Sequence, residues 1–351
     1  MNILFAGSPA IAVPSLELLA TLELDETIAP GLRHRVVGVL TNPDAAKGRG
    51  KRMEATDVAN TAERISALCT SAGLPSIPLF KPERLDADTR AAIQALQPDL
   101  LVVVAYGHIF GAKFLSIFPR GGINLHPSRL PKYRGCAPIP AAILNRDTET
   151  ALSVQRLALE VDSGDLLAVK RLPLDDSATT ASLTELAAQK GAPLLLSVID
   201  AIAQGREQAT AQDHAAATFC DMLRKEDGLL DWSRGALELD ARIRAFTPWP
   251  GAFTTSKGLI LRILEAKPLS SAWMASSAIS AGSTISAGAA QSGTVLGIDK
   301  NSGILVQTGD GVLALGRLQY ETKKALDWRS FLNGTRDLIG SRLGTTTAWN
   351  A

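Results

Sequence analysis

The apolar run at residues 99–105, which reads DLLVVVA, constrains the fold more than any other part of the chain. A continuous run of aliphatic and β-branched residues predicts a strand that is buried on both faces. Such strands belong to parallel sheets with helices on either side, because a strand with one wet face would alternate instead. Shorter apolar runs at 2–6 and 36–40 precede segments with helical spacing at 11–22 and 57–69. The sequence therefore predicts an α/β domain with a doubly wound, mostly parallel sheet.

The pattern changes after residue 204, and the length of 351 residues also favours two domains. Residues 1–204 are assigned to the α/β domain, and residues 205–218, which lose apolar periodicity, to a linker. Residues 219–351 are predicted to form an OB-like β-barrel, because short β-like runs alternate there with turns. These runs lie at 259–265, 294–298, 303–307 and 312–318. Residues 270–292, rich in Ser, Ala, Gly and Thr, are interpreted as an insertion in a barrel loop.

Composition narrows the class of protein. A hydrophobic fraction of 46% and a charged fraction of 20% are typical of a soluble globular protein. The sequence has no continuous apolar run of about 18 residues and therefore predicts no membrane span, and its strand-like start predicts no secretory signal. Cys69, Cys136 and Cys220 are odd in number and far apart, so they predict neither a disulfide framework nor a zinc site. We therefore expect a cytoplasmic protein.

The charge balance argues against a strongly basic domain. Residues 1–204 carry 20 Lys and Arg against 21 Asp and Glu, and residues 205–351 carry 16 against 14. A bound nucleic acid would therefore be held by local patches. The densest basic cluster consists of Lys47, Arg49, Lys51 and Arg52. This cluster is either a solvated loop or a flexible finger for phosphates, and the local sequence supports both interpretations.

The stretch at 121–138, GGINLHPSRLPKYRGCAP, carries the candidate chemistry. Alternation along a strand places Asn124 and His126 on the same face. The prolines that follow keep the chain extended or turned, as in a stiff polar loop. In a doubly wound sheet, ligands bind beyond the carboxyl ends of the strands. We therefore expect these two side chains at a binding site, although a turn with a hydrogen-bonded histidine would give the same pattern.

The residue types suit acyl transfer to an amine. Asn124 could donate a hydrogen bond to the oxyanion of a tetrahedral intermediate, and His126 could donate to it or move a proton. Asp165, in the acidic turn at 161–167, could orient the imidazole or accept the proton of the attacking amine. Metal binding by His108 and His126 is a rival interpretation, but a zinc site needs about four ligands. We therefore predict no metal.

Several motifs resemble the folate-dependent formyltransferases. NLHPSRLPKYRGCAPI at 124–139 and VDSGDLL at 161–167 carry the core of the resemblance. It extends over the whole chain, through FAGSP at 5–9, TNPDAAKGRGKR at 41–52, KEDGLLDWS at 225–233, IRAFTPWPGAF at 243–253 and FLNG at 331–334. The basic segment, the IRAFTPWPGAF segment and the second domain are most similar to the branch of the family that acts on tRNA.

The resemblance implies that a formyl group passes from 10-formyltetrahydrofolate to the α-amine of methionine on initiator tRNA, for translation initiation. It assigns the catalytic roles to Asn124, His126 and Asp165. It further assigns folate contact to the segment Ser128, Arg129, Leu130 and Pro131, in which Arg129 stands where the family is usually apolar.

The same resemblance implies a tRNA-binding role for the basic cluster and for the second domain, through residues such as Arg242, Arg244, Lys323 and Lys324. We expect a monomer that does not engage a membrane. The segments 24–34 and 270–292 are longer than is usual in the family, and both are interpreted as loop insertions.

Three alternatives remain. The first is formyl transfer to a sugar amine by another branch of the family. The second is a non-catalytic RNA-binding protein, against which the Asn124, His126 and Asp165 set argues. The third is a dinucleotide oxidoreductase, which the α/β domain alone would allow, but the chain has no GxGxxG fingerprint after its first strand.

Overall fold

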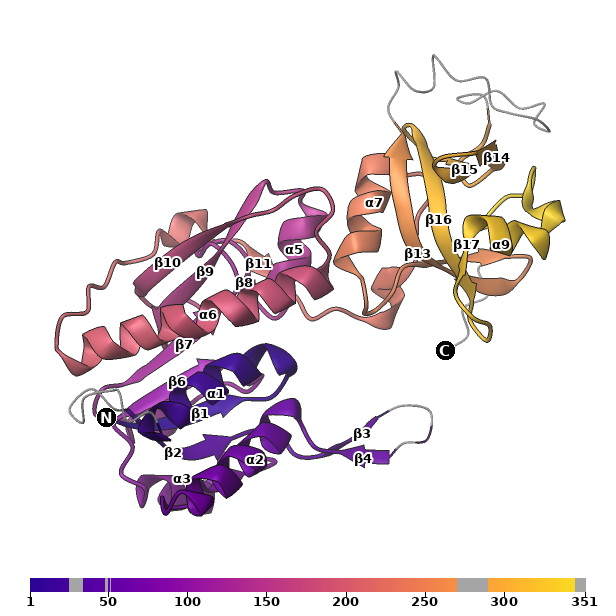
Figure 1. The fold of residues 1–351 in the computed structure, drawn as a ribbon. Coiled ribbons are helices and arrows are strands. Elements are labelled where there is room, and N and C mark those ends of the chain that lie inside the picture. The colour runs from indigo at the N-terminus through magenta and orange to yellow at the C-terminus, as the bar shows by residue number, and fades with distance from the viewer. Residues whose placement is uncertain (25–33, 48–49, 51, 270–289, 345–351) are drawn as a thin grey trace. The chain divides into compact units, whose positions relative to one another are not determined.

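The computed structural model describes residues 1–24, 34–47, 50, 52–269 and 290–344 (Figure 1). The predicted insertions at 24–34 and 270–292 lie largely outside the described residues. Two compact units are present. The N-terminal unit comprises Met1–Pro138, Thr148–Pro173 and Ser182–Asp221, and the C-terminal unit comprises Ile139–Asp147, Leu174–Ala181 and Met222–Ala351.

The N-terminal unit is built on a seven-stranded sheet in the order β10-β9-β7-β6-β1-β2-β5. Its strands are β1 (Asn2–Gly7), β2 (Arg35–Leu40), β5 (Leu79–Phe80), β6 (Leu100–Val104), β7 (Gly122–His126), β9 (Glu149–Arg156) and β10 (Leu166–Pro173). The strands from β7 to β5 in this order pair in parallel, while β9 and β10 pair antiparallel at the other edge. The predicted mostly parallel sheet is confirmed, with every residue of β6 buried.

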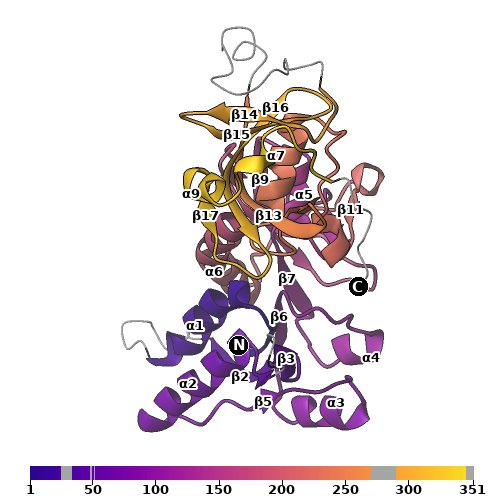
Figure 2. The same ribbon diagram turned by 90° about the vertical axis from the view of Figure 1, so that its right-hand side faces the viewer.

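Helices cover both faces of this sheet. α1 (Val13–Thr21), α2 (Asp57–Ser71) and α6 (Thr180–Ala203) lie on one face, and α3 (Ala87–Gln94) and α4 (Ala112–Leu115) lie on the other (Figure 2). The helix starts have local causes: the Thr56 hydroxyl accepts from Ala59 N at 3.0 Å, and the Asp86 carboxylate accepts from Thr89 N at 2.9 Å. The short helix α5 (Pro138–Leu144) follows the loop after β7.

By length and composition alone, the helix α6 is long and apolar enough to cross a membrane. It is nevertheless packed within the protein, where nine of its residues are buried. A Cβ added at Gly191 would lie 2.5 Å from Cδ2 of Leu125 in β7, so the helix approaches the sheet closely at this point. These features are those of a core helix.

Two small β pairs complete the unit. β3 (Ala45–Lys47) and β4 (Arg52–Glu54) form an antiparallel hairpin after β2, where the sequence predicted a loop. β8 (Arg134–Gly135) pairs in parallel with β11 (Phe219–Cys220).

Short 3-10 helices occur in both units, at Ala10–Ala12, Leu22–Leu24, His214–Ala216, Lys225–Gly228 and Arg336–Leu338.

The C-terminal unit is an antiparallel sheet in the order β12-β13-β16-β15-β14, with β17 paired to β16. Its strands are β12 (Phe253–Ser256), β13 (Leu259–Leu269), β14 (Val295–Asp299), β15 (Gly303–Gln307), β16 (Val312–Tyr320) and β17 (Leu326–Asp327), and its helices are α7 (Ala236–Ala245) and α9 (Trp328–Asn333). The four predicted β-like runs correspond to β13 to β16. Buried aliphatic side chains of β13, β15, β16 and α7, with Trp232, form its core.

The predicted OB-like barrel is not confirmed, because the sheet keeps β12 and β14 as edges in the described residues. The irregular segment 340–344 lies between these edges. Val295 N donates to Ser341 O at 2.9 Å on the β14 side, and Gly344 N donates to Thr255 O at 2.9 Å on the β12 side. On the β14 side, Gly340 N also donates to Val295 O at 2.8 Å and Leu343 N to Gly293 O at 2.9 Å, around an isolated antiparallel bridge between Thr294 and Arg342. The segment therefore joins the two edges by a few backbone hydrogen bonds and not by a strand paired along both.

Candidate active site

Strand β7 delivers Asn124 and His126 to the carboxyl end of the sheet. In the antiparallel pair with β9, Asn124 lies opposite Gln155 and His126 lies opposite Ser153. The intervening Leu125 contacts α6 on the other face of the sheet. The alternation that the sequence predicted therefore places the amide and the imidazole on the same face.

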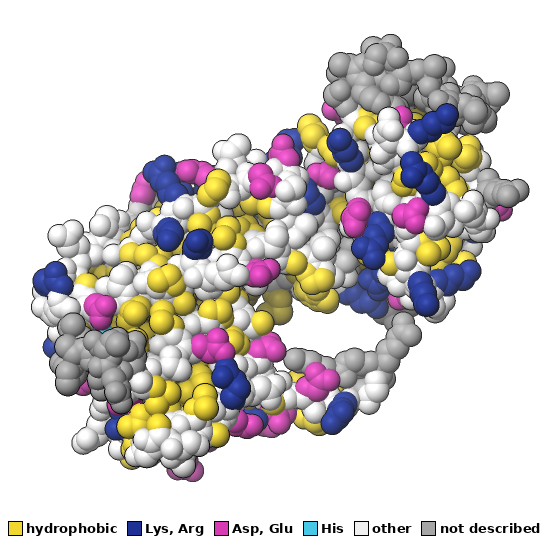
Figure 3. Space-filling view, viewed as in Figure 1, with side chains coloured by type: hydrophobic (Ala, Val, Ile, Leu, Met, Phe, Trp, Pro, Cys, Tyr) yellow, Lys and Arg dark blue, Asp and Glu magenta, His cyan; other side chains and the backbone are white. Residues whose placement is uncertain are grey.

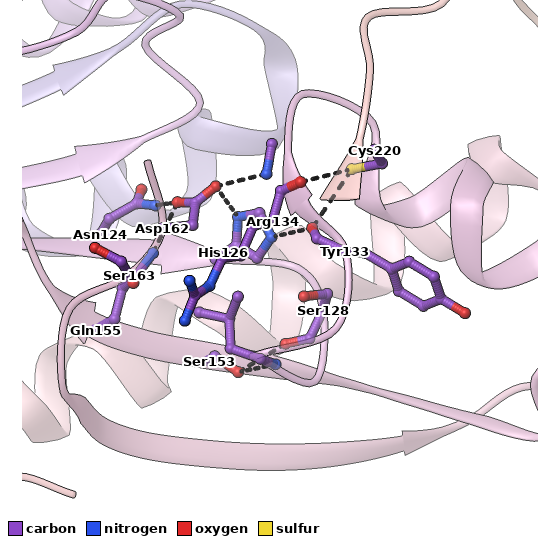
Figure 4. Close-up of polar contacts among 12 residues, drawn as sticks. Asn124, His126, Ser128, Tyr133, Arg134, Ser153, Gln155, Asp162, Ser163 and Cys220 are labelled. Atoms are coloured by element: carbon purple, nitrogen blue, oxygen red, sulfur yellow. Dashed lines mark hydrogen bonds and ion pairs between the residues drawn. The ribbon is translucent and has the colours of Figure 1, made fainter. Parts of the chain in front are cut away.

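The imidazole of His126 is buried and held at both ring nitrogens (Figure 4). Nε2 lies 2.9 Å from the carbonyl oxygen of Tyr133. A carbonyl only accepts, so Nε2 carries a hydrogen and donates to it. Nδ1 lies 3.5 Å from Oδ2 of Asp162. The ring is thereby fixed between a backbone carbonyl and a carboxylate.

Asp162 joins the two predicted residues. Its Oδ1 accepts from Asn124 Nδ2 at 3.2 Å and from Gln155 Nε2 at 2.7 Å. Its Oδ2 accepts from the backbone nitrogen of Gly135 at 2.9 Å. The side chain is 11% exposed. These donors all match a carboxylate that acts only as an acceptor, and they place it between the amide and the imidazole.

The prediction that Asp165 takes this position is wrong. Asp165 is exposed at the start of β10, where its backbone carbonyl accepts from Arg156 N at 2.9 Å. The turn between the two acids is tight, because a Cβ on Gly164 would lie 1.9 Å from the Arg156 carbonyl oxygen. The chain therefore reverses within this turn, and its first acid, not its second, reaches His126.

Three residues with positive φ surround this cluster. Ala105 directly follows β6 with φ 51°, Tyr133 has φ 60° and Asp162 has φ 51°. The left-handed region is unfavourable for side chains other than glycine, by about 1–3 kcal/mol each, and such residues concentrate at functional sites. Two of these residues, Tyr133 and Asp162, carry the carbonyl and the carboxylate that face His126.

The predicted folate segment shapes the loop after β7. Ser128 is fully buried, and its hydroxyl donates to Lys132 O at 2.6 Å. The Ser153 hydroxyl donates to Ser128 O at 2.7 Å and accepts from Leu130 N at 3.3 Å. Arg129 is exposed and donates to Glu149 Oε1 at 2.6 Å. Folate contact by Ser128, Arg129, Leu130 and Pro131 stays a prediction, and Arg129 is the member whose charged group reaches solvent.

Two of the four predicted tRNA cations belong to the β3–β4 hairpin. Lys47 ends β3 and pairs in register with Arg52, which begins β4 and is exposed. Arg49 and Lys51 lie outside the described residues. Their tRNA-binding role stays a prediction.

In the C-terminal unit, the candidate cations divide into two kinds. Arg242 donates to Asp227 O at 2.6 Å, and Arg244 pairs with Asp240 at 2.8 Å with its side chain 15% exposed. Lys323 and Lys324 are exposed. On the face drawn in Figure 3, Lys and Arg side chains are spread over this unit with Asp and Glu among them. The two lysines are therefore better placed than the two arginines to meet a phosphate.

The two histidines of the rival metal interpretation have different surroundings. His108 is exposed and its ring is tilted against that of Tyr106, with centroids 5.1 Å apart, while both ring nitrogens of His126 face protein groups. In the described part of the chain, no three His, Cys, Asp or Glu side chains come together as a metal site would require.

Burial raises the pKa of Tyr106 to about 12, so its phenol stays protonated beside the stacked ring of Phe110.

A parallel sheet that presents an amide, an imidazole and a carboxylate at its carboxyl edge defines a candidate acyl-transfer site. Residues 11–199 match the family described as formyl transferase, and residues 222–336 match its C-terminal domain. The chain belongs to the formyl transferase family.

Particular relatives are similar over nearly the whole chain. A methionyl-tRNA formyltransferase of Treponema denticola is 44% identical over 97% of this chain and 98% of its own length. One of Treponema pallidum, strain Nichols, is 46% identical over 98% of this chain and 99% of its own length. HypX from Aquifex aeolicus in complex with tetrahydrofolic acid shares the fold, with a TM-score of 0.58 at 16% identity over 97% of this chain. This chain spans 48% of that protein.

Proposed function

We propose that this chain transfers a formyl group from 10-formyltetrahydrofolate to the α-amine of methionyl initiator tRNA. The observation that carries the proposal is the Asp162 carboxylate, which lies between the Asn124 amide and the His126 imidazole. The relatives named methionyl-tRNA formyltransferase, which match both units, support this acceptor over a sugar amine. We propose that the enzyme acts as a cytoplasmic monomer.

The reaction needs no protein nucleophile, because the amine attacks the formyl carbon itself. A new C–N bond forms to the methionine nitrogen, and the bond from the formyl carbon to the folate nitrogen breaks. Asp162 accepts the proton that the amine loses, and a proton returns to the leaving folate nitrogen. Asn124 turns its Nδ2 donor from Asp162 to the oxyanion, and His126 is held beside it.

Binding of the two substrates is divided along the chain. We assign folate contact to the loop at 128–131, where Ser128 and Leu130 hold the backbone and Arg129 offers a charge. We assign tRNA contact to the β3–β4 hairpin and to Lys323 and Lys324. In this scheme the catalytic domain comprises residues 1–204 and the tRNA-binding domain comprises residues 219–351. Residues 205–218 link the two domains.

The test is a formylation assay with the purified full chain. The formyl donor is supplied with charged initiator tRNA, with charged elongator tRNA, and with a free amino sugar. We expect formyl-methionine only from the initiator tRNA arm. Formylation of the sugar with no tRNA product would overturn the proposal in favour of the sugar branch.

A further inference from the structure

We propose that Arg134, Gln212 and Gln155 form a hydrogen-bonded chain that positions the Asp162 carboxylate for the reaction. The inference rests on the proposed function for its kinetic readout. None of the three side chains reaches the reacting atoms in this scheme, so all three are positioning residues. Gln212 lies in the segment 205–218, which the sequence predicts to be a linker.

The chain of contacts is continuous. The Arg134 guanidinium donates to Gln212 Oε1 through Nη2 at 2.7 Å and Nε at 3.2 Å. Gln212 Nε2 lies 3.3 Å from Gln155 Oε1, the longest link of the chain, because its two hydrogens are shared between this oxygen and two backbone carbonyl oxygens. Gln155 Nε2 then donates to Oδ1 of Asp162 at 2.7 Å. A cation stands at one end and the carboxylate of the site at the other.

The chain has a single direction. A guanidinium only donates, so the oxygen of Gln212 faces Arg134 and its nitrogen faces the site. The oxygen of Gln155 must then face Gln212, which turns its nitrogen to Asp162. Reversing either amide would set donor against donor at one end and acceptor against acceptor at the other. The cation therefore fixes the orientation of both amides.

The chain is also buried. Gln155 is 1% exposed, Arg134 is 4% exposed and Gln212 is 5% exposed. Water cannot readily replace a lost contact at such depth, so each member depends on its neighbours. Arg134 has one further partner, because its Nη2 donates to His214 Nδ1 at 3.2 Å.

Gln212 holds the backbone of the acidic turn as well. Its Nε2 lies 2.9 Å from the carbonyl oxygen of Asp162 and 2.6 Å from that of Gly164. The same amide therefore contacts two backbone carbonyls of the turn in which Asp162 adopts its positive φ. Backbone bonds fix the segment that carries Gln212, through Thr210 to Leu166 and through Thr218 to Pro131 and Arg134.

This arrangement explains how Asn124 can change partners. Asn124 Nδ2 shares Oδ1 of Asp162 with Gln155, and its bond is the longer one, at 3.2 Å against 2.7 Å. When the Asn124 amide turns to the oxyanion, the donor of Gln155 stays on the carboxylate. Asp162 then keeps its place beside the attacking amine.

The kinetic test uses Gln155→Met and Gln212→Met, which keep length but cannot hydrogen-bond. We expect kcat to fall at least about tenfold, with KM for both substrates within about threefold, because misplacement by about 1 Å can cost about 100-fold. The matched control is Gln307→Met, a buried glutamine of the C-terminal unit that donates to Thr308 O and Gly311 O. Equal kcat losses in the control at equal loss of Tm would overturn the proposal.

A double-mutant cycle separates positioning from general damage. If Gln155 acts through Asp162, Gln155→Met should cost less than about twofold in kcat when Asp162→Asn is already present. A full, independent loss in that background would contradict the inference. Gln155→Glu adds a second check: it keeps the size, removes the donor and sets an anion against Asp162, so its kcat should fall below that of Gln155→Met.

Crystal structures of the two methionine variants give a readout that needs no substrate. We expect the Asp162 carboxylate to leave its position 3.5 Å from His126 Nδ1. An acidic turn that superimposes on the wild type would overturn the positioning role, whatever the acceptor of the enzyme. Failure of the wild type to formylate tRNA would instead refute the proposed function alone.

Discussion

The site at the end of β7 and the β3–β4 hairpin differ in how their side chains are held, although both follow parallel strands at the same edge of one sheet. In the site, His126 is 4% exposed and Asp162 accepts three hydrogen bonds. In the described part of the hairpin, β3 and β4 form a two-stranded sheet of their own with a short ladder, and every residue of β4 is exposed.

The difference matches two kinds of task. Acyl transfer needs atoms fixed within fractions of an ångström, so its groups are buried and held from several sides. Attraction of a polyanion needs charged side chains that extend into solvent, because counterion release does not depend on exact geometry. Substitutions should therefore cost most activity in the held region and least in the exposed one.

The largest effect is expected at the acidic turn. Asp162→Asn removes the acceptor for the amine proton and should lower kcat by about 10³-fold, within the usual range for a general base. Asp165→Asn is the matched control, because Asp165 is an exposed acid of the same turn, and it should keep kcat within about twofold. Single-turnover formylation of charged initiator tRNA measures both. A larger loss for Asp165→Asn would favour the sequence-based assignment of that residue.

The next effect concerns the oxyanion. Asn124→Ala removes a donor and should lower kcat by about 100-fold, while KM for the tRNA stays nearly constant. Steady-state kinetics with both substrates varied will separate the two parameters. An unchanged kcat would mean that the amide serves only Asp162.

A smaller effect is expected in the basic cluster of Lys47, Arg49, Lys51 and Arg52. Lys51→Ala combined with Arg52→Ala should raise KM for the tRNA by several-fold and leave kcat for bound substrate nearly intact. Each lost phosphate contact should flatten the slope of log affinity against log salt by about 0.7–0.9. Lys190→Ala, an exposed lysine of α6, is the control. A slope equal to that of the control would make the hairpin a solvated loop.

The smallest effect leaves activity unchanged and reports how closed the site is. Burial raises the pKa of the Cys220 thiol to about 11, and its Sγ contacts the carbonyl oxygens of Tyr133 and Arg134 at 3.4 Å. At pH 8 the thiolate, which is the reactive form, is then only about one part in a thousand. Iodoacetamide should label exposed Cys136 well before Cys220, and the Cys220 rate should rise about tenfold per pH unit. Equal labelling rates of Cys136 and Cys220 at pH 8 would argue that β11, which carries Cys220, separates freely from β8.

The sequence predicted the scaffold well because local patterns determine it. The apolar run at 99–105 identified a central parallel strand, and alternation placed Asn124 and His126 on one face. Such local patterns could not decide whether Asp162 or Asp165 lies beside His126. Both acids lie in one short turn, and the close approach of Gly164 to the Arg156 carbonyl, which no residue type reveals, decides which acid points inward.

The glutamines were missed for a different reason. Gln155 and Gln212 are 57 residues apart in sequence, and neither lies in a motif. Gln212, in the segment 205–218, is held by hydrogen bonds, which leave no periodic pattern in a sequence. The predicted barrel is not confirmed, since the irregular segment 340–344, not another strand, lies between β12 and β14 in the described residues.

The late position of Gln212 has a consequence for the order in which the protein matures. During synthesis, the three residues to which we assign the chemistry, Asn124, His126 and Asp162, have all left the ribosome once residue 162 has emerged. The amide that orients them emerges fifty residues later, and the strand β11 that closes on β8 later still. A nascent chain that stops at residue 204 carries every reactive group without the bonds that align them. In the proposed scheme the reacting groups are therefore aligned only near residue 220, when the segment that carries Gln212 and β11 has emerged.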